Sequence, residues 1–414
     1  MSITRRGFLR NSALAVVGTA AVPRFLARAA MGAAEPGLRT KRLVVIFQRG
    51  AADGLNIVVP HGEPQYYAMR PSINIPRKAV LDLDGFFGLH PSLASFQPLW
   101  QQRQLAIVHA AGSPDPSRSH FDAQDFMEAG TPGVKSTEDG WLNRSLRNLP
   151  HPAQKSAFQA IAMGPSIPRI LGGLEPAIAM NNINDFSVGG RGAKPSPVAS
   201  AFEAMYDHSA DAVLHGTGEE TFDAVKMLKA ADPSKYKPAP GADYPKGRFG
   251  DSLRQLAQLI KANLGVQVAF ADIGGWDHHV NEGATEGQIA NVLRDFAQAL
   301  AAFWTDLGDL GKDTVVVTMS EFGRTARENG NRGTDHGHAN VMFVLGGPVK
   351  GGKVYGRWPG LDQSQLYEGR DLALTTDFRQ VLGEVIAQHM GNANLNDVFP
   401  GYGNQPGKFL KFLE

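Results

Sequence analysis

The stretch Val315-Val316-Val317-Thr318-Met319-Ser320-Glu321-Phe322-Gly323-Arg324 changes character halfway along its length. Its first half is an apolar, β-branched run with the composition of a strand buried on both faces. Its second half is polar and continues through a glycine-broken loop to Thr334-Asp335-His336-Gly337-His338, ahead of a second apolar run from Val341 to Leu345. A strand, a polar loop and another strand predict an active-site edge of an open α/β sheet.

Carboxylate and imidazole side chains gather in this loop. Asp335, His336 and His338 are of the types that hold zinc and similar cations in proteins. The same side chains could instead cap and tie down a long loop. Matching polar groups elsewhere in the chain favour the metal-binding interpretation.

Three other apolar runs are followed by polar side chains. The run from Leu43 to Phe47 leads to Asp53, in a turn where an aspartate could equally bond to its own backbone. The run from Leu105 to His109 leads to Ser119, which could be a helix N-cap, a nucleophile, or both. The run from Val266 to Ala271 leads to Asp272, Asp277, His278 and His279.

Amphipathic segments alternate with these strands. Helical spacing of apolar residues predicts helices over Leu89 to Trp100, from an N-cap at Asp251, after a capping-box pattern at Thr285 and Gln288, and over Thr376 to His389. Strands that alternate with helices favour a mostly parallel central sheet with helices on both faces. We predict one α/β domain over residues 36–414, with a mainly helical cap or insertion within residues 145–248.

Composition excludes several classes of function. The 414 residues carry a formal net charge of +1, which offers no electrostatic basis for binding nucleic acid. The chain has no cysteine, so it has no disulfide, no thiolate metal site and no cysteine nucleophile. Any bound metal ion must be held by oxygen and nitrogen ligands.

Residues 1–35 have the pattern of a twin-arginine signal. Thr4-Arg5-Arg6-Gly7-Phe8-Leu9-Arg10 precedes an apolar run from Ala13 to Val22 and small residues around Ala29. The run is too short and too alanine-rich for a good membrane span, and an amphipathic helix unrelated to export is the alternative. We expect the twin-arginine translocation machinery to export the chain to the periplasm or extracellular space, with no integral membrane span in the mature chain.

The order of these groups resembles the alkaline phosphatase and sulfatase superfamily. More closely, the chain is similar to a bacterial family of twin-arginine-exported proteins of unknown function that is usually attached to that superfamily. The matching stretches span nearly all of the mature chain: Arg49 to Pro60, Ser119-His120-Phe121-Asp122-Ala123-Gln124, Gly275-Trp276-Asp277-His278-His279, Ser320-Glu321-Phe322-Gly323-Arg324, Gly333-Thr334-Asp335-His336-Gly337-His338 and Thr375-Thr376-Asp377-Phe378-Arg379. The resemblance implies an alkaline phosphatase-like fold that holds divalent metal ions, whether zinc, calcium, magnesium or manganese.

Carried over by position, the resemblance implies two metal sites. Asp53, Ser119 and Glu321 belong to the first site, and Asp335 could serve either. The second site takes Asp277, His279, His336 and His338. Members of the superfamily usually have an Asp-His pair directly after the strand where this chain has Ser320-Glu321, so the first site departs from the pattern.

The hypothesis that follows is a metal-dependent hydrolase of phosphate or sulfate esters. Ser119 attacks the ester, and the cations stabilise the attacking and leaving oxygens. One of His278, His279 or His338 moves protons.

Two arginines have roles that the sequence leaves open, and two alternative functions fit the same residues. Arg49 and Arg324 could bind the anionic ester substrate, or they could pair with neighbouring carboxylates. One alternative function is a superfamily fold that has lost turnover and serves as an exported metal- or anion-binding or assembly protein. The other is a metal-dependent enzyme outside ester hydrolysis, in which Ser119 is only a helix cap.

Overall fold

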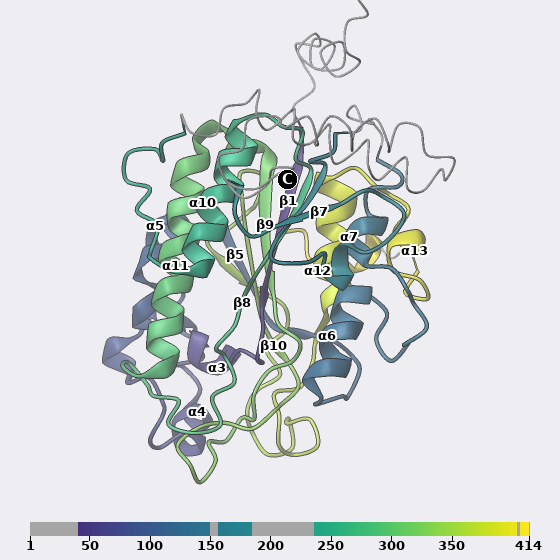
Figure 1. Cartoon of the computed structure of the whole chain (residues 1–414). Helices are drawn as coiled ribbons and strands as arrows, with labels where there is room; N and C mark the ends of the chain where they lie inside the picture. The colour runs from purple at the N-terminus through teal and green to yellow at the C-terminus, as the bar shows by residue number, and fades with distance from the viewer. Residues whose placement is uncertain (1–39, 150–155, 184–235, 404–405, 414) are drawn as a thin grey trace, which may run out of the picture.

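A computed structural model of the chain describes residues 40–149, 156–183, 236–403 and 406–413 (Figure 1). The predicted signal segment and much of the predicted helical cap or insertion, residues 184–235, lie outside these residues. In the described part of the chain, no helix is long and apolar enough to cross a membrane.

A nine-stranded sheet forms the centre of the molecule, in the order β11-β5-β10-β9-β1-β8-β6-β7, with β12 beside β5. The strands are β1 (Arg42–Gln48), β5 (Leu105–Gly112), β6 (Ala160–Met163), β7 (Ile178–Met180), β8 (Val268–Ile273), β9 (Thr314–Met319), β10 (Asn340–Gly346), β11 (Lys353–Tyr355) and β12 (Thr376–Asp377). Among these paired strands only β10 is antiparallel to its neighbours, β5 and β9. The predicted α/β class with a mostly parallel sheet is confirmed.

The strand register brings the polar loops to one edge. Phe47 near the end of β1 is level with Asp272 on β8 and with Met319 on β9, so three neighbouring strands end at the same height. Because β10 runs the other way, its first residues lie at this same edge. The whole loop of residues 320–339, from the end of β9 to the start of β10, therefore stays there.

Helices cover both faces of the sheet (Figure 1). One face carries α5 (Gln97–Gln101), α10 (Arg248–Lys261) and α11 (Gln288–Leu307), and the other carries α6 (His120–Ala129), α7 (Trp141–Arg144), α12 (Phe378–Glu384) and α13 (Leu395–Val398). Side chains alternate along β1 as a strand requires. Val44 and Ile46 pack in the core with α10 and α11, whereas Val45 and Phe47 pack in the core with α12.

Short elements surround this core. A second, antiparallel sheet is formed by β2 (Val58–Val59), β4 (Gly88–Leu89) and β3 (Leu81–Asp82), beside α3 (Gly54–Ile57) and α4 (Pro64–Met69). Turns of 3₁₀-helix occur at Arg77–Ala79, Pro91–Phe96, Arg169–Leu171, Gly308–Asp313 and Pro406–Lys408. A π-helical turn, Val385–His389, continues α12.

Several predicted helix starts are wrong. The first helix begins as a 3₁₀ turn at Pro91, and α10 begins at Arg248, so Asp251 lies inside its first turn. The capping box at Thr285 and Gln288 does not form. Instead α11 begins at Gln288, whose amide donates to the carbonyls of Val280 and Asn281.

The last helix also starts later than predicted. It begins at Phe378, where Asp377 and Gln380 form a capping box.

Part of the range predicted as a cap belongs to the sheet. Strands β6 and β7 lie within residues 145–248, and both extend the parallel array beyond β8. Residues 184–235 of that range lie outside the described chain.

Candidate metal centre

Three side chains from three loops meet at the carboxyl edge of the sheet. His120 is the first residue of α6, Asp277 follows β8, and His336 precedes β10. Their ligand atoms all lie within 4.8 Å of one another, and they form the only group of this kind among the described residues. His279 is a fourth candidate ligand: its Nε2 is 3.1 Å from Oδ1 of Asp277. We call His120, Asp277, His279 and His336 the metal cluster.

The distances between neighbouring donor atoms in the metal cluster resemble those between the ligands of one cation. Nε2 of His279 is 2.9 Å from Nε2 of His336, which is 3.4 Å from Oδ1 of Asp277. Nε2 of His120 is 3.5 Å from Oδ2 of Asp277. Two ligands bound tetrahedrally to zinc at about 2.0–2.1 Å are roughly 3.3 Å apart. The donor atoms of His120, Asp277 and His336 thus lie close enough together for one ion, and Nε2 of His279 lies within 3.1 Å of two of them.

Each imidazole of the metal cluster is held at its other nitrogen. Nδ1 of His120 is 2.8 Å from Oε1 of Glu321, and Nδ1 of His279 is 3.2 Å from Oδ1 of Asp335. Nδ1 of His336 is 2.8 Å from the carbonyl oxygen of Arg118. With the ring proton on Nδ1, each imidazole donates to its acceptor and its Nε2 is left to bind a cation, as in metal-binding histidines.

The Nε2 atom of His120 gives a direct test of whether a cation fits. It is buried and has no hydrogen-bond partner in the described structure. A buried polar atom without a partner is costly, and a bound cation would satisfy it. Three imidazole nitrogens and one carboxylate are a donor set that divalent transition metals accept.

Glu321 supports His120 from behind. Its buried carboxylate accepts hydrogen bonds from His120, from Nε2 of Gln124 at 2.8 Å and from the backbone N–H of Gly50 at 2.9 Å. Burial by itself raises the pKa of Glu321, but these donors, His120 first, outweigh burial and hold the pKa below its ordinary value. The arrangement makes Glu321 a positioning residue for His120, whereas the sequence predicted it as a ligand.

Arg324 brings a positive charge to the same place. Its side chain is buried, and its Nη2 donates to Oδ1 of Asp277 at 2.6 Å. Its Nε and Nη1 atoms are buried without a partner in the described chain. Burial opposes ionisation of Asp277, but Arg324, His279 and His120 together hold the pKa of this carboxyl below its ordinary value. The unfilled guanidinium donors are suited to an anionic group beside the metal cluster.

Two glycines allow the loops to come this close. Gly50 has φ +117°, and a Cβ there would lie 2.9 Å from the backbone nitrogen of Asp277. A Cβ on Gly337 would lie 2.3 Å from the carbonyl carbon of Arg324, at the bridge between Arg324 and His336. A side chain at either position would force the loops apart.

Asp53 is not brought into the metal cluster. Both of its oxygens accept from the guanidinium of Arg70, which is fully buried. Glu282 is buried in the same place and accepts from the hydroxyl of Thr334 at 2.8 Å. Burial, and then the charge of Asp53, raises the pKa of Glu282 well above its ordinary value. We call Asp53, Arg70 and Glu282 the buried ion network.

Other predicted histidines lie near the metal cluster without joining it. His338 is buried and stacks on Tyr367, with 4.3 Å between ring centroids. His278 is also buried, and burial followed by the charge of Arg324 lowers its pKa to about 4. Asp335 touches the cluster only through Nδ1 of His279 and also accepts from Asn329.

Ser119 lies exposed at the surface, whereas Arg49 is partly buried and ion-paired. Ser119 is exposed, and its hydroxyl caps α6 by accepting from the backbone N–H of Asp122 at 3.5 Å. Arg49 pairs with Glu128 and Asp272, each at 2.8 Å. For Arg49, the structure has the carboxylate pairing that the sequence left open.

His120 is the cluster member that sequence reasoning missed. It is next to Ser119 within a stretch that resembles a known family, but the hydroxyl at the helix start attracted the functional assignment. The available signal was a metal-ligand residue type soon after a strand end, the same pattern that identified Asp277 and His279. Its match with Glu321 spans 201 positions and has no local signature.

Comparisons with solved structures give matches of low similarity. Solved structures with partial similarity include the lipoteichoic acid synthase LtaP from Listeria monocytogenes, with 11% identity, 74% of this chain and 65% of that chain covered, and a TM-score of 0.33. The C-terminal periplasmic domain of EcEptC from Escherichia coli, in complex with Zn, has 9% identity, 75% and 73% coverage, and a TM-score of 0.34. The phosphonate monoester hydrolase of Agrobacterium radiobacter has 10% identity, 88% and 78% coverage, and a TM-score of 0.31. TM-scores this low assign no activity to the chain.

A search of curated proteins gives no significant match. A family model described as "Protein of unknown function (DUF1501)" matches residues 40–399. The chain belongs to this family.

Proposed function

We propose that this member of the DUF1501 family is an exported, zinc-dependent hydrolase of phosphate or sulfate esters. The observation that carries the proposal is the metal cluster, in which the Nε2 atoms of three imidazoles lie within 3.5 Å of the Asp277 carboxylate and every Nδ1 faces an acceptor. Export rests on the twin-arginine pattern at Arg5 and Arg6.

The ligand types favour zinc among the four candidate metals. Calcium and magnesium prefer oxygen ligands, whereas an imidazole-rich set suits zinc. His120, Asp277, His279 and His336 would hold the ion. When bound, it would polarise the ester and stabilise negative charge on an oxygen.

Arg324 supports an anionic substrate. Two of its buried nitrogens have no partner within the described residues, and the third contacts Asp277 of the metal cluster. A phosphate or sulfate oxygen would accept from these donors, and a neutral ester would leave them unsatisfied. Arg324 would therefore bind and orient the charged end of the ester.

Ser119 is the proposed nucleophile. Its exposed hydroxyl lies at the start of α6, one residue before His120. Attack forms a bond between the serine oxygen and phosphorus or sulfur, and the ester bond to the alcohol breaks as the alcohol takes up a proton. Water then releases phosphate or sulfate and restores the hydroxyl. Partly positive backbone N–H groups at the helix start favour the anion throughout.

Metal binding without turnover is the second candidate. Asp53 is occupied by Arg70, and Glu321 is directed at His120, so neither is free to build a second metal site. A chain with one metal position could keep the ion and have no ester chemistry. This alternative predicts the same zinc content and no hydrolysis.

The test measures zinc and turnover on the same samples. The full chain is expressed with its own signal and recovered from the periplasm, and changing Arg5 and Arg6 to lysine should retain it in the cytoplasm. Elemental analysis should give one zinc per chain, lost in Asp277→Asn. Aryl phosphate or aryl sulfate hydrolysis should fall by at least about 100-fold in Ser119→Ala with zinc retained.

A matched serine and two outcomes complete the test. Ser72→Ala removes another exposed serine hydroxyl, far along the chain from α6, and should keep full activity. Zinc without hydrolysis by the unaltered chain would support the second candidate. A chain that binds no zinc at all would sink both.

A further inference from the structure

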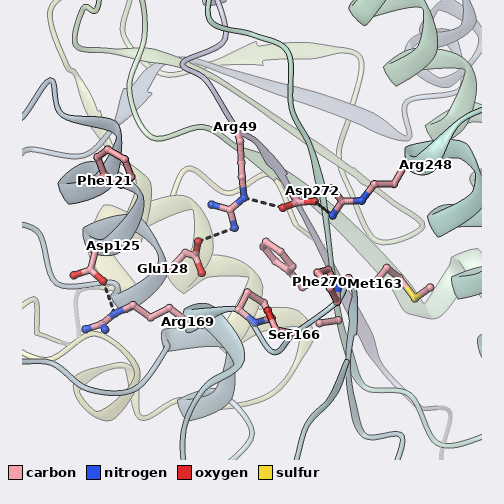
Figure 2. Close-up of a pocket in the computed structure, with 14 residues that line it drawn as sticks. Arg49, Phe121, Asp125, Glu128, Met163, Ser166, Arg169, Arg248, Phe270 and Asp272 are labelled. Atoms are coloured by element: carbon pink, nitrogen blue, oxygen red, sulfur yellow. Dashed lines mark hydrogen bonds and ion pairs between the residues drawn. The ribbon is translucent and has the colours of Figure 1, made fainter. Parts of the chain in front are cut away.

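A pocket of about 400 Å³ is lined by Arg49, Phe121, Asp272 and neighbouring side chains (Figure 2). It is lined by the residue that follows β1, by the inner side of α6, by the loop after β6, and by Asp272 on β8. Its volume is in the range of pockets that take small ligands. Neither the metal cluster nor the proposed chemistry uses it.

A series of side-chain hydrogen bonds connects the pocket lining to the metal cluster. Arg49 donates from Nη1 to the side-chain oxygen of Gln124 at 2.8 Å, and the amide nitrogen of Gln124 donates to Glu321 at 2.8 Å. Glu321 in turn holds His120. Phe121, the next residue, lines the pocket. Because His120 and Phe121 are adjacent at the start of α6, we infer that one ligand can contact both the metal cluster and the pocket.

Charges in the pocket balance within it. Figure 2 shows a row of ion pairs in which Arg248 contacts Asp272, Asp272 contacts Arg49, and Arg49 contacts Glu128, at 2.9, 2.8 and 2.8 Å. A separate pair joins Arg169 to Asp125 at 2.8 Å. Three arginines face three carboxylates, so the pocket has no surplus charge to attract an ion. It offers many donors and acceptors side by side, which suit hydroxyl groups because a hydroxyl both donates and accepts.

An aromatic ring stands at the mouth of the pocket. Phe121 is 90% exposed, the highest value among the large hydrophobic side chains of the described residues. Pro165 and Pro168 add apolar surface to the lining. An exposed phenyl ring beside a polar floor offers one apolar face and one hydrogen-bonding face to the same ligand.

We propose that this pocket binds a neutral sugar unit, which is the alcohol part of the ester. A sugar ring has hydroxyl groups for the ion-paired floor and an apolar C–H face for Phe121. The pocket as a sugar site stands on its own contacts. The statement that the substrate is a phosphate or sulfate ester of a sugar rests on the proposed function.

The experiment measures sugar binding without catalysis. Saturation-transfer NMR with methyl glucoside, methyl galactoside and methyl N-acetylglucosaminide is applied to the full chain, with and without zinc. At least one glycoside should bind in both states. Phe121→Ala should weaken that binding about tenfold, since the stacking face is lost. Asp125→Asn, which breaks the pair with Arg169, should weaken it as well.

A matched control distinguishes binding at the pocket from nonspecific binding to exposed hydrophobic side chains. Leu174→Ala removes another large hydrophobic side chain, 82% exposed and outside the pocket lining, and should leave glycoside binding unchanged. Equal losses in Phe121→Ala and Leu174→Ala, or no binding of any glycoside, would overturn the proposal. Glycoside binding by the unaltered, zinc-loaded chain without any ester hydrolysis would support the sugar site and reject only the proposed function. Aryl ester hydrolysis without glycoside binding would reject only the sugar site.

Discussion

The metal cluster and the buried ion network lie at the same edge of the sheet, yet they differ in whether their polar atoms have hydrogen-bond partners. In the buried ion network, both oxygens of Asp53 accept from Arg70, and Glu282 accepts from Thr334. At the metal cluster, the Nε2 atom of His120 and two nitrogens of the adjacent Arg324 have no hydrogen-bond partner in the described chain. A carboxylate after a strand thus marks a binding site only where neighbouring groups leave donors or lone pairs unsatisfied.

The same contrast separates the histidines. His109 uses both ring nitrogens within the fold: Nδ1 accepts from the backbone N–H of Ala110, and Nε2 donates to the carbonyl of Val58. Among the cluster histidines only His336 has a backbone partner, at Nδ1, and its Nε2 faces Nε2 of His279 at 2.9 Å. A histidine with two backbone partners is structural, whereas a ring nitrogen without a backbone partner can bind a ligand.

Arg70→Ala should have the largest effect, on stability. It leaves Asp53 buried without its partner, and loss of one member of a buried ion pair costs about 3–5 kcal/mol. Urea unfolding of the metal-free chain should show this loss. Arg77→Ala, which removes an exposed arginine nearby in sequence, should change the free energy of unfolding by less than about 0.5 kcal/mol. Similar small losses in both variants would contradict the contrast between the two regions.

His109→Gln should change the pH dependence of stability. Burial lowers the pKa of His109 from 6.5 to about 4, against smaller opposing effects of Val58 and Asp53. Because the folded pKa lies below the unfolded one, this neutral ring contributes stability above about pH 6.5 that is lost as the pH falls toward 4, up to roughly 3 kcal/mol. Unfolding free energies measured across this window should therefore fall less steeply in the variant.

His90 provides a parallel case for that measurement. Its Nδ1 accepts from Ser92, its Nε2 donates to Ala284, and burial lowers its pKa to about 4 as well. His90→Gln should flatten the same window. Slopes equal to that of the unaltered chain in both variants would show that these rings charge as readily in the folded as in the unfolded state.

Glu321→Gln should have the smallest of these effects, on zinc affinity. The substitution keeps every member of the metal cluster but weakens the acceptor that holds Nδ1 of His120. Loss of such a partner typically costs 10- to 100-fold in metal affinity, or about 1.4–2.8 kcal/mol. Competition with a chromophoric chelator measures this change. Glu328→Gln, whose carboxylate bonds to Ser72, is the matched control, and equal affinities in the two variants would remove Glu321 from its positioning role.

The fold was largely accessible from local patterns. The β-branched run at Val315 to Val317 and the apolar run that precedes Asp53 gave the correct strands. Helix starts were less accurate, as at Gln288, because a capping side chain can bond to loop carbonyls instead of its own helix. Propensity specifies that a helix forms near a position, and tertiary contacts decide where it begins.

Much less of the candidate centre was accessible. The types and approximate positions of Asp277, His279 and His336 were predicted, but Glu321 and Asp53 were expected as ligands and instead hold other side chains. His120 was missed because its acceptor comes from a distant loop. Whether a carboxylate binds a metal or an arginine depends on which group the folded chain places beside it.

The sequence by itself determined the class of fold and the edge where polar groups collect, because side-chain periodicity and the strand–loop–helix order are local properties. Only the tertiary structure decided that Arg70 pairs with Asp53 and that three imidazoles place their Nε2 atoms near Asp277. The physical reason is that burying a polar group without a partner is costly, so the packing around each group decides which partner it has. That partner comes from loops distant in the chain, held in contact by positions such as Gly50 and Gly337.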